Sequence, residues 1–125
     1  MKKFSIAWKA SNKPGKQRKH RSNSPLSVKH KFMQAHLSKE LRQKYGKRSL
    51  GLRKGDMVKV MAGKFKKHEG RVEGARLRKI SVIVSGAEIT KKDGTKKLVA
   101  LHPSNLMITE LNLDDKFRQK LLERK

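Results

Sequence analysis

The sequence predicts a mainly β fold, a small barrel with short N-terminal helices, a basic N-terminal arm and a C-terminal helix. Two observations lead to this prediction. Between residues 48 and 111, β-branched and other apolar residues recur with a period of two in several short runs. Glycine-containing turns separate these runs, as is typical of a small barrel. Outside that stretch, the apolar spacing and the capping residues indicate short helices.

The chain is strongly basic, with 34 Lys and Arg against 10 Asp and Glu in 125 residues and a formal net charge of +24. Such a chain attracts polyanions, either nucleic acid or an anionic membrane surface. Only 34% of the residues are hydrophobic, so the core must be small. The absence of cysteine excludes disulfides and cysteine-based zinc motifs. No apolar run is long enough to span a bilayer, and the N-terminus lacks a signal-peptide core, so we expect a cytoplasmic protein.

The positive charge is concentrated toward the N-terminus. Residues 1–50 carry 15 Lys and Arg against one acid, whereas residues 110–125 carry five against four. A graded distribution indicates a docking surface rather than a general aid to solubility. Residues 1–23 have no apolar periodicity, and like charges at this density oppose compaction. We therefore expect residues 1–23 to form a basic extended arm that orders along a phosphate backbone.

Short helices are expected over residues 24–47. Ser24 and Pro25 are suited to a helix start. The apolar spacing of this first helix comes from Leu26, Phe32, Met33 and Leu37. Ser38 can cap a second helix, which Gly46 would end.

Several short strands are expected over residues 48–111, and they should form the barrel. The runs with strand character are Met57–Met61, Gly70–Gly74, Lys79–Val84, two strands that flank a turn at Asp93-Gly94, and Leu106–Glu110. Val58 and Val60 should point into the core, with Lys59 outside. Gly86 is expected to end the Lys79–Val84 strand.

A C-terminal helix is expected within residues 112–125. Its acids come first and its bases last, as the helix dipole favours. One apolar face is predicted from Leu113, Phe117, Leu121 and Leu122.

The stretch VMAGKFKKHEGRVEGA, residues 60–75, could hold a site for chemistry. A phosphate-binding P-loop needs two glycines five residues apart, then Lys and a hydroxyl residue, but position 58 is Val58 and Phe65 follows Lys64. A zinc-protease motif that starts at His68 needs a second histidine at position 72, which is Val72. The stretch is therefore predicted to be a basic loop between two strands, with Phe65 as its core anchor.

The same region resembles a known motif. The pattern Lys54-Gly55-Asp56-x-Val58-x-Val60-x-x-Gly63-x-x-Lys66-x-x-x-Gly70-x-Val72 is similar to the KOW motif. That motif implies an SH3-like β-barrel of the kind found in ribosomal proteins and transcription elongation factors. The flanks resemble the archaeal and eukaryotic branch of ribosomal protein L-twenty-four, numbered twenty-six in eukaryotes. They include Ser38-Lys-Glu-Leu-Arg-Gln-Lys-Tyr45, Leu52-Arg-Lys54, Leu101-His-Pro-Ser-Asn105 and the terminal Leu-Glu-Arg-Lys.

This resemblance, which covers about Ser24 to Lys125, implies a structural RNA-binding protein of the large ribosomal subunit. It implies primary binding near the five-prime region of large-subunit rRNA, a role early in assembly, and a position near the polypeptide exit. It also implies neighbouring ribosomal proteins as partners, with no enzymatic activity, cofactor, metal, membrane or small-molecule substrate. The chain lacks the long basic tail of eukaryotic members, so an archaeal type is expected.

RNA contacts are expected mainly from cationic side chains. The RNA contacts of the loop from Gly63 to Gly70 and of the basic N-terminal part are implied by the resemblance. The other expected RNA contacts are inferred from the positive charge of the residues. The expected RNA-binding residues are Lys13, Lys16, Arg18, Lys19, Arg21, Lys29, Lys31, Arg42, Lys44, Arg48, Lys54, Lys64, Lys66, Lys67, His68, Arg71, Arg76 and Arg78. With so few aromatic residues, base stacking cannot be the main source of affinity, so Phe4, Trp8 and Tyr45 should contribute less than the cations.

Two other classes of protein are alternatives for a basic chain of this kind. A transcription elongation module would share the barrel, but it is usually joined to a polymerase-binding domain, for which this chain is too short. A basic RNA-processing enzyme needs a carboxylate cluster or a histidine pair in a cleft. The acids of the barrel are scattered among bases, which favours local pairing: Asp56, Glu69, Glu73, Glu88 and Asp93.

Overall fold

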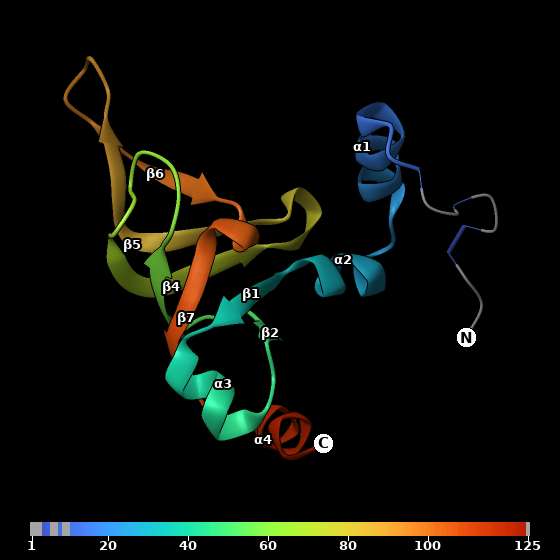
Figure 1. Cartoon of the computed structure of the whole chain (residues 1–125). Coiled ribbons are helices and arrows are strands. Elements are labelled where there is room, and N and C mark those ends of the chain that lie inside the picture. Colours follow the sequence, from blue (N-terminus) through green and yellow to red (C-terminus); the bar gives the residue numbers. More distant parts are fainter. Residues whose placement is uncertain (1–3, 6–7, 9–10, 125) are drawn as a thin grey trace.

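The computed structural model of the chain describes residues 4, 5, 8 and 11–124 and contains one strongly bent sheet with helices at both ends (Figure 1). The helices are α1 (Pro14–Asn23), α2 (Leu26–Phe32), α3 (Lys39–Tyr45) and α4 (Lys116–Glu123), with short 3-10 turns η1 (Leu77–Lys79) and η2 (Pro103–Asn105). The strands are β1 (Gln34–Leu37), β2 (Ser49–Gly51), β3 (Met57–Val60), β4 (Glu69–Arg76), β5 (Ser81–Thr90), β6 (Lys96–Leu101) and β7 (Leu106–Glu110). Their order in the sheet is β2-β1-β7-β3-β4-β5-β6. The predicted mainly β, barrel-like fold is confirmed.

The core lies inside the bend of the sheet and is made by alternate residues of the strands. Its fully buried members include Val58, Val60, Val72, Val82, Val84, Leu106 and Ile108. The inward orientation predicted for Val58 and Val60 is confirmed, and Lys59 between them pairs with Glu69 at the surface. Alternate burial is the reason that the period of two identifies these strands correctly.

The predicted first helix ends earlier than expected. It stops at Phe32, and Gln34–Leu37 form strand β1, which runs parallel to β7 with His36 opposite Met107. The prediction that Leu37 belongs to a helix was therefore wrong. Met33, Ala35 and Leu37 are all buried, so this stretch has the period of two of a strand. Pairing with β7 provides hydrogen-bond partners for the backbone N–H and C=O groups of β1. One further helical turn at this place would not pair with the sheet.

Residues Pro14–Asn23 of the predicted extended arm form helix α1, so the prediction of an extended conformation was wrong there. Residues 1–3, 6–7 and 9–10 of the predicted arm lie outside the described residues. Proline in the first turn and the Lys, Arg and Gln side chains that follow favour a helix. Two hydrogen bonds hold its C-terminal end. Ser24 Oγ donates to the His20 carbonyl at 2.5 Å, and Lys29 Nζ donates to the Ser22 carbonyl at 3.0 Å. Ser24 therefore closes α1 instead of capping α2.

Helix α3 has the predicted ends. The Ser38 hydroxyl accepts a hydrogen bond from the Leu41 amide, and Gly46 takes a left-handed conformation after the last turn. Gly86 was predicted to end a strand, but β5 continues through it to Thr90. Its φ of +76° lies where the pairing of β5 with β6 shifts register, so this glycine forms a bulge. The turn predicted at Asp93-Gly94 is confirmed between β5 and β6.

Strand β4 crosses β5 very closely at Gly70. A Cβ atom at Gly70 would lie 2.6 Å from the Ser85 carbonyl oxygen and 2.9 Å from Val84 Cγ1. On the same side of the crossing, His68 Nε2 donates to the Ser85 carbonyl at 2.8 Å, and its ring lies beside Gly86. These contacts fix the direction in which the loop between β3 and β4 leaves the barrel.

Helix α4 does not bury the apolar face that was predicted. Leu122 is buried, but Phe117 is 81% exposed and Leu121 is 48% exposed. The side chain that α4 buries most deeply is the charged Arg118, which is only 4% exposed. The sequence prediction was wrong here because the partner of Arg118 lies far away in the sequence, in the turn before β3.

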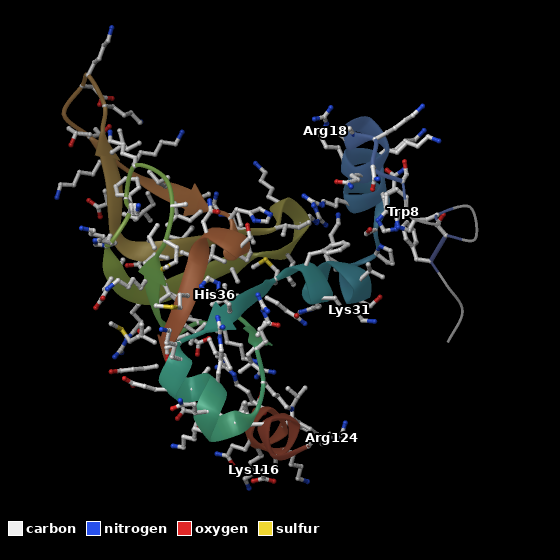
Figure 2. The ribbon with its side chains drawn as sticks, in the orientation of Figure 1. Trp8, Arg18, Lys31, His36, Lys116 and Arg124 are labelled. Atoms are coloured by element: carbon white, nitrogen blue, oxygen red, sulfur yellow. The ribbon has the colours of Figure 1, made fainter. Side chains whose placement is uncertain are left out.

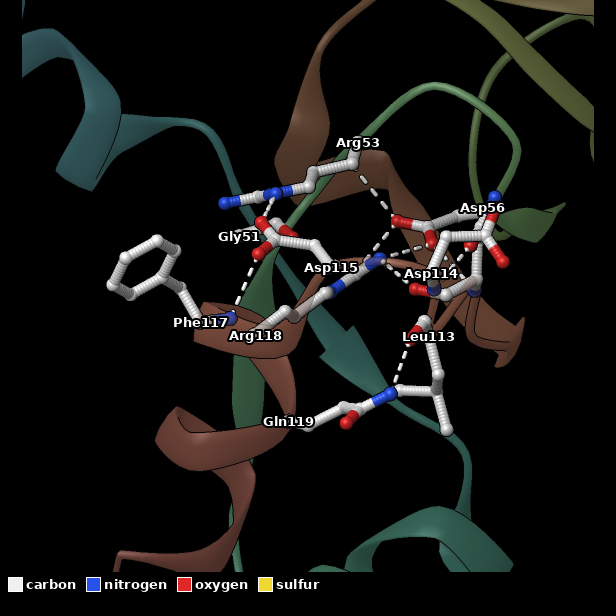
Figure 3. A network of polar contacts seen from close by, with 10 residues as sticks. Gly51, Arg53, Asp56, Leu113, Asp114, Asp115, Phe117, Arg118 and Gln119 are labelled. Carbon is white, nitrogen blue, oxygen red and sulfur yellow. Dashed lines mark hydrogen bonds and ion pairs between the residues drawn. The ribbon is translucent and has the colours of Figure 1, made fainter.

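That partner is Asp56, which is fully buried and forms a bidentate ion pair with Arg118 (Figure 3). Arg118 Nη1 donates to Asp56 Oδ1 at 2.6 Å, and Nη2 donates to Oδ2 at 2.7 Å. The carboxylate also accepts hydrogen bonds from the backbone amides of Arg53 and Asn112. The guanidinium donates further to the carbonyls of Gly51 and Asn112. One ion pair thus joins β2, the turn before β3, the segment after β7 and α4.

We predict that Arg118→Met lowers the free energy of unfolding by about 3–5 kcal/mol, because it leaves the Asp56 carboxylate buried without its counter-charge. The matched control is Lys59→Met, which removes the exposed pair with Glu69 and should change stability by less than about 1 kcal/mol. Urea denaturation followed by circular dichroism measures both. Equal small effects of the two substitutions would contradict a structural role for the buried pair.

Two glycines of β4 differ in the space around them, so we predict different effects when each is replaced by alanine. Gly70→Ala should lower stability by about 1–3 kcal/mol, since the added methyl group meets backbone and core atoms of β5. A Cβ atom at Gly74 has no neighbour within 4 Å, so Gly74→Ala should have little effect in the same denaturation experiment. If Gly74→Ala were the more damaging substitution, the close crossing at Gly70 would not be the constraint that we describe.

Candidate nucleic-acid interface

The loop between β3 and β4 presents three lysines on a fixed frame. The Lys67 amide donates to the Val60 carbonyl at 2.8 Å, and Lys67 takes a left-handed conformation with φ of 72°. Phe65 is half-buried and packs against the core, so its predicted role as an anchor is confirmed. The side chains of Lys64, Lys66 and Lys67 are exposed. The loop can therefore hold three ammonium groups toward a ligand without a change in the barrel.

His68 has a different position from these lysines. It is half-buried, and its Nε2 hydrogen bond to the Ser85 carbonyl ties it to β5. His68 was among the predicted RNA contacts, and the structure also gives it a part in positioning the loop.

The N-terminal helices carry most of the other predicted cations. Figure 2 shows Arg18 on α1 and Lys31 on α2, both reaching outward from their helices. The exposed predicted residues of this region are Lys13, Lys16, Arg18, Lys19, Arg21 and Lys31. Lys29 is the exception, because it is buried and its ammonium group binds the Ser22 carbonyl at the end of α1.

The remaining predicted cations lie on α3 and around the barrel. Arg42 is half-buried, and its Nε donates to the Leu37 carbonyl at 2.7 Å. Lys44 lies over the Tyr45 ring at 5.3 Å from the ring centroid, a cation–π contact. The exposed members are Lys44, Arg48, Lys54, Arg71, Arg76 and Arg78. Figure 1 places the α1–α2 pair, α3 and the β3–β4 loop on three different sides, so the structure does not gather the predicted cations into one patch.

Two histidines near these cations have lowered pKa values. Burial lowers the pKa of His36 most, and the nearby Arg42 and Arg48 lower it further. Burial also lowers the pKa of His102, with a smaller effect of Arg21. Both imidazoles are therefore mostly neutral at pH 7, so the positive electrostatic potential around them comes from Lys and Arg.

The basic hairpin between β5 and β6 was not among the predicted RNA contacts. Its tip carries four exposed lysines, namely Lys91, Lys92, Lys96 and Lys97. Lys96 lies 3.5 Å from Glu88 in an exposed pair, which leaves it available to other anions. The signal was present in the sequence as two Lys-Lys pairs on either side of the Asp93-Gly94 turn.

The local pairing that was predicted for the acids is seen for Glu69 and Glu88, whereas Asp56 pairs with a residue 62 positions away. Asp56 pairs with Arg118, Glu69 with Lys59 at 2.7 Å, and Glu88 with Lys96. A hydrogen bond from the Thr95 hydroxyl lowers the pKa of Asp93, which belongs to the hairpin turn. Across the described ranges, no three His, Asp or Glu side chains come close enough to hold a metal ion. None of the described helices has the length and apolarity needed to cross a membrane.

Comparison with known proteins gives matches over almost the whole chain. The model of the family that comprises the eukaryotic ribosomal proteins L26 and their archaeal counterparts, numbered twenty-four, matches residues 11–125. "Large ribosomal subunit protein uL24" of Methanosphaera stadtmanae is 44% identical over 115 residues, which are 92% of this chain and 98% of the relative. The protein with the same name from Korarchaeum cryptofilum is 46% identical over 115 residues, or 92% of this chain and 88% of the relative. The chain therefore belongs to this family of ribosomal proteins, which are structural components rather than enzymes.

Proposed function

We propose that this protein is a structural constituent of the large ribosomal subunit, in the cytoplasm, and that it binds large-subunit rRNA. The names of its archaeal relatives support this assignment. The observation that best supports the proposed rRNA binding is the exposure of the predicted cations. All of them are exposed except Lys29, Arg42 and His68.

The distribution of these cations suits a protein enclosed by folded RNA. A protein that binds one side of a duplex needs its charge on one face, whereas here exposed cations lie on α1, on α3 and on the β3–β4 loop (Figure 1). Each cation that neutralises a phosphate releases condensed counterions, so binding should weaken steeply with salt. Shape, backbone phosphates and 2′-hydroxyls are the features that such a surface can recognise.

The small core supports the proposed role early in assembly. The proposed position near the polypeptide exit rests on the family resemblance alone. A ligand that binds only the folded state adds to its stability, so a chain with few apolar residues gains from early association with rRNA. Neighbouring ribosomal proteins are further proposed partners. Helix α4 suits such contacts because residues 110–125 are nearly neutral and Phe117 and Leu121 are exposed.

The alternative function as a transcription elongation module would use the same barrel. The family match extends beyond the barrel through both sets of flanking helices, from residue 11 to residue 125. This extent favours the ribosomal function.

We predict that the triple substitution Lys64→Ala, Lys66→Ala and Lys67→Ala weakens binding to large-subunit rRNA. The slope of log affinity against log salt concentration should become less steep by about 2–3, since each lost phosphate contact changes it by about 0.7–0.9. Filter binding or fluorescence anisotropy at several salt concentrations measures this. Trp8→Ala should cause a smaller loss of affinity than the triple substitution.

The matched control is Lys116→Ala, Lys120→Ala and Arg124→Ala, which removes the same charge from exposed positions of α4. Its effect on the slope should be clearly smaller, because α4 is the proposed protein-contact surface. Equal slopes for the two triple variants would mean that total charge, rather than the loop, determines binding. A greater loss from Trp8→Ala than from the loop variant would overturn the ranking of cations above aromatic residues.

A further inference from the structure

A small cleft lies between α1 and the described residues that precede it. Its volume is about 330 Å³, and it is lined by Phe4 and Trp8 on one side and by Lys16, Lys19, His20 and Asn23 on the other. The α1 residues at positions 16, 19, 20 and 23 share one face of the helix, because they are spaced by three, four and seven residues. Figure 2 shows Trp8 beside α1, at the side of the molecule away from α3 and α4.

The floor of this cleft is aromatic. The Trp8 and His20 rings are stacked with centroids 4.3 Å apart and an interplanar angle of 21°. The Phe4 ring is tilted against His20 at 5.3 Å, and Phe32 of α2 meets His20 edge-on at 6.5 Å. This cluster joins α1 to α2 through a single histidine.

Internal packing accounts for only part of this cluster. Helix α1 buries none of its own residues, so the rings contribute to holding it in place. Rings that served packing alone would be covered, yet Phe4 is 42% exposed and Trp8 is half-buried. The exposed ammonium groups of Lys16 and Lys19 and the amide of Asn23 surround the opening. An apolar planar surface with cations and an amide at its rim matches the chemistry of a nucleotide.

We propose that this cleft binds one unpaired RNA base, an inference that rests on the rRNA binding proposed above. Bases that are not paired commonly stack on aromatic side chains in protein–RNA complexes. The base would stack on the Phe4–Trp8–His20 cluster, while Lys16 and Lys19 bind the adjacent phosphates. The Asn23 amide can both donate to and accept from the edge of the base. The volume lies at the lower end of ligand sites, about 300–1,000 Å³, and suits a single nucleotide.

Trp8 is the only tryptophan of the chain, so its fluorescence reports on this cleft alone. The unmodified protein is titrated with a single-stranded RNA and with a duplex of the same sequence, while anisotropy of a label on the RNA measures binding. The single strand should quench Trp8 and the duplex should not, because its bases are already stacked on one another. Binding of the single strand without quenching, or equal quenching by both RNAs, overturns the inference alone. If neither the single strand nor the duplex binds, the proposed function is contradicted as well.

Substitutions separate base stacking from support of α1. Trp8→Ala should weaken single-strand binding about tenfold and leave the salt slope and the duplex affinity unchanged, since stacking carries no charge. Trp8→Phe keeps an aromatic surface and should restore most of the lost affinity. Phe117→Ala, at an exposed aromatic residue on α4, is the control and should change neither affinity. Equal losses for single strand and duplex with Trp8→Ala would assign Trp8 to packing and overturn the inference.

Discussion

The buried ion pair between Asp56 and Arg118 is the interaction on which the arrangement of the basic surfaces depends. Both carboxylate oxygens and both terminal guanidinium nitrogens are used, and their partners come from four separate segments of the chain. The Arg53 amide is one of these partners, so the same carboxylate fixes the backbone that presents the exposed Arg53 and Lys54. In a chain with a net charge of +24, a fully buried acid is held because an equally buried base neutralises it.

The barrel could be predicted from the sequence because its strands alternate and its turns contain glycine. Prediction failed where distant contacts decide the structure. Strand β1 was assigned to a helix because Ser24 and Pro25 suggested a helix start, although Met33, Ala35 and Leu37 already alternate. Arg118 lies in a helix with apolar neighbours, and nothing local indicates that its partner is Asp56, 62 residues away. Helix α1 was missed because charge repulsion was given more weight than the helix propensity of Lys, Arg and Gln.

For the predicted RNA-binding residues, the sequence indicated exposure better than it indicated contacts within the protein. The predicted side chains are exposed in most cases, because lysines and arginines are rarely buried. The sequence did not show that the Lys29 ammonium group binds the Ser22 carbonyl at the end of α1, or that His68 binds a carbonyl of β5. Both residues act on the frame that holds the neighbouring cations. The structure thus separates cations that face outward from polar groups that fix their positions, a distinction that depends on contacts between distant segments.

The barrel displays cations on several sides, and we propose that rRNA of the large subunit encloses it. The most direct measurement is co-sedimentation of the protein with ribosomal subunits from its own cells, followed by a moderate salt wash. We expect the protein to be found with the large subunit and to stay there after the wash, because many phosphate contacts must break together. A protein found mainly in the free fraction, with none on large subunits, would contradict it.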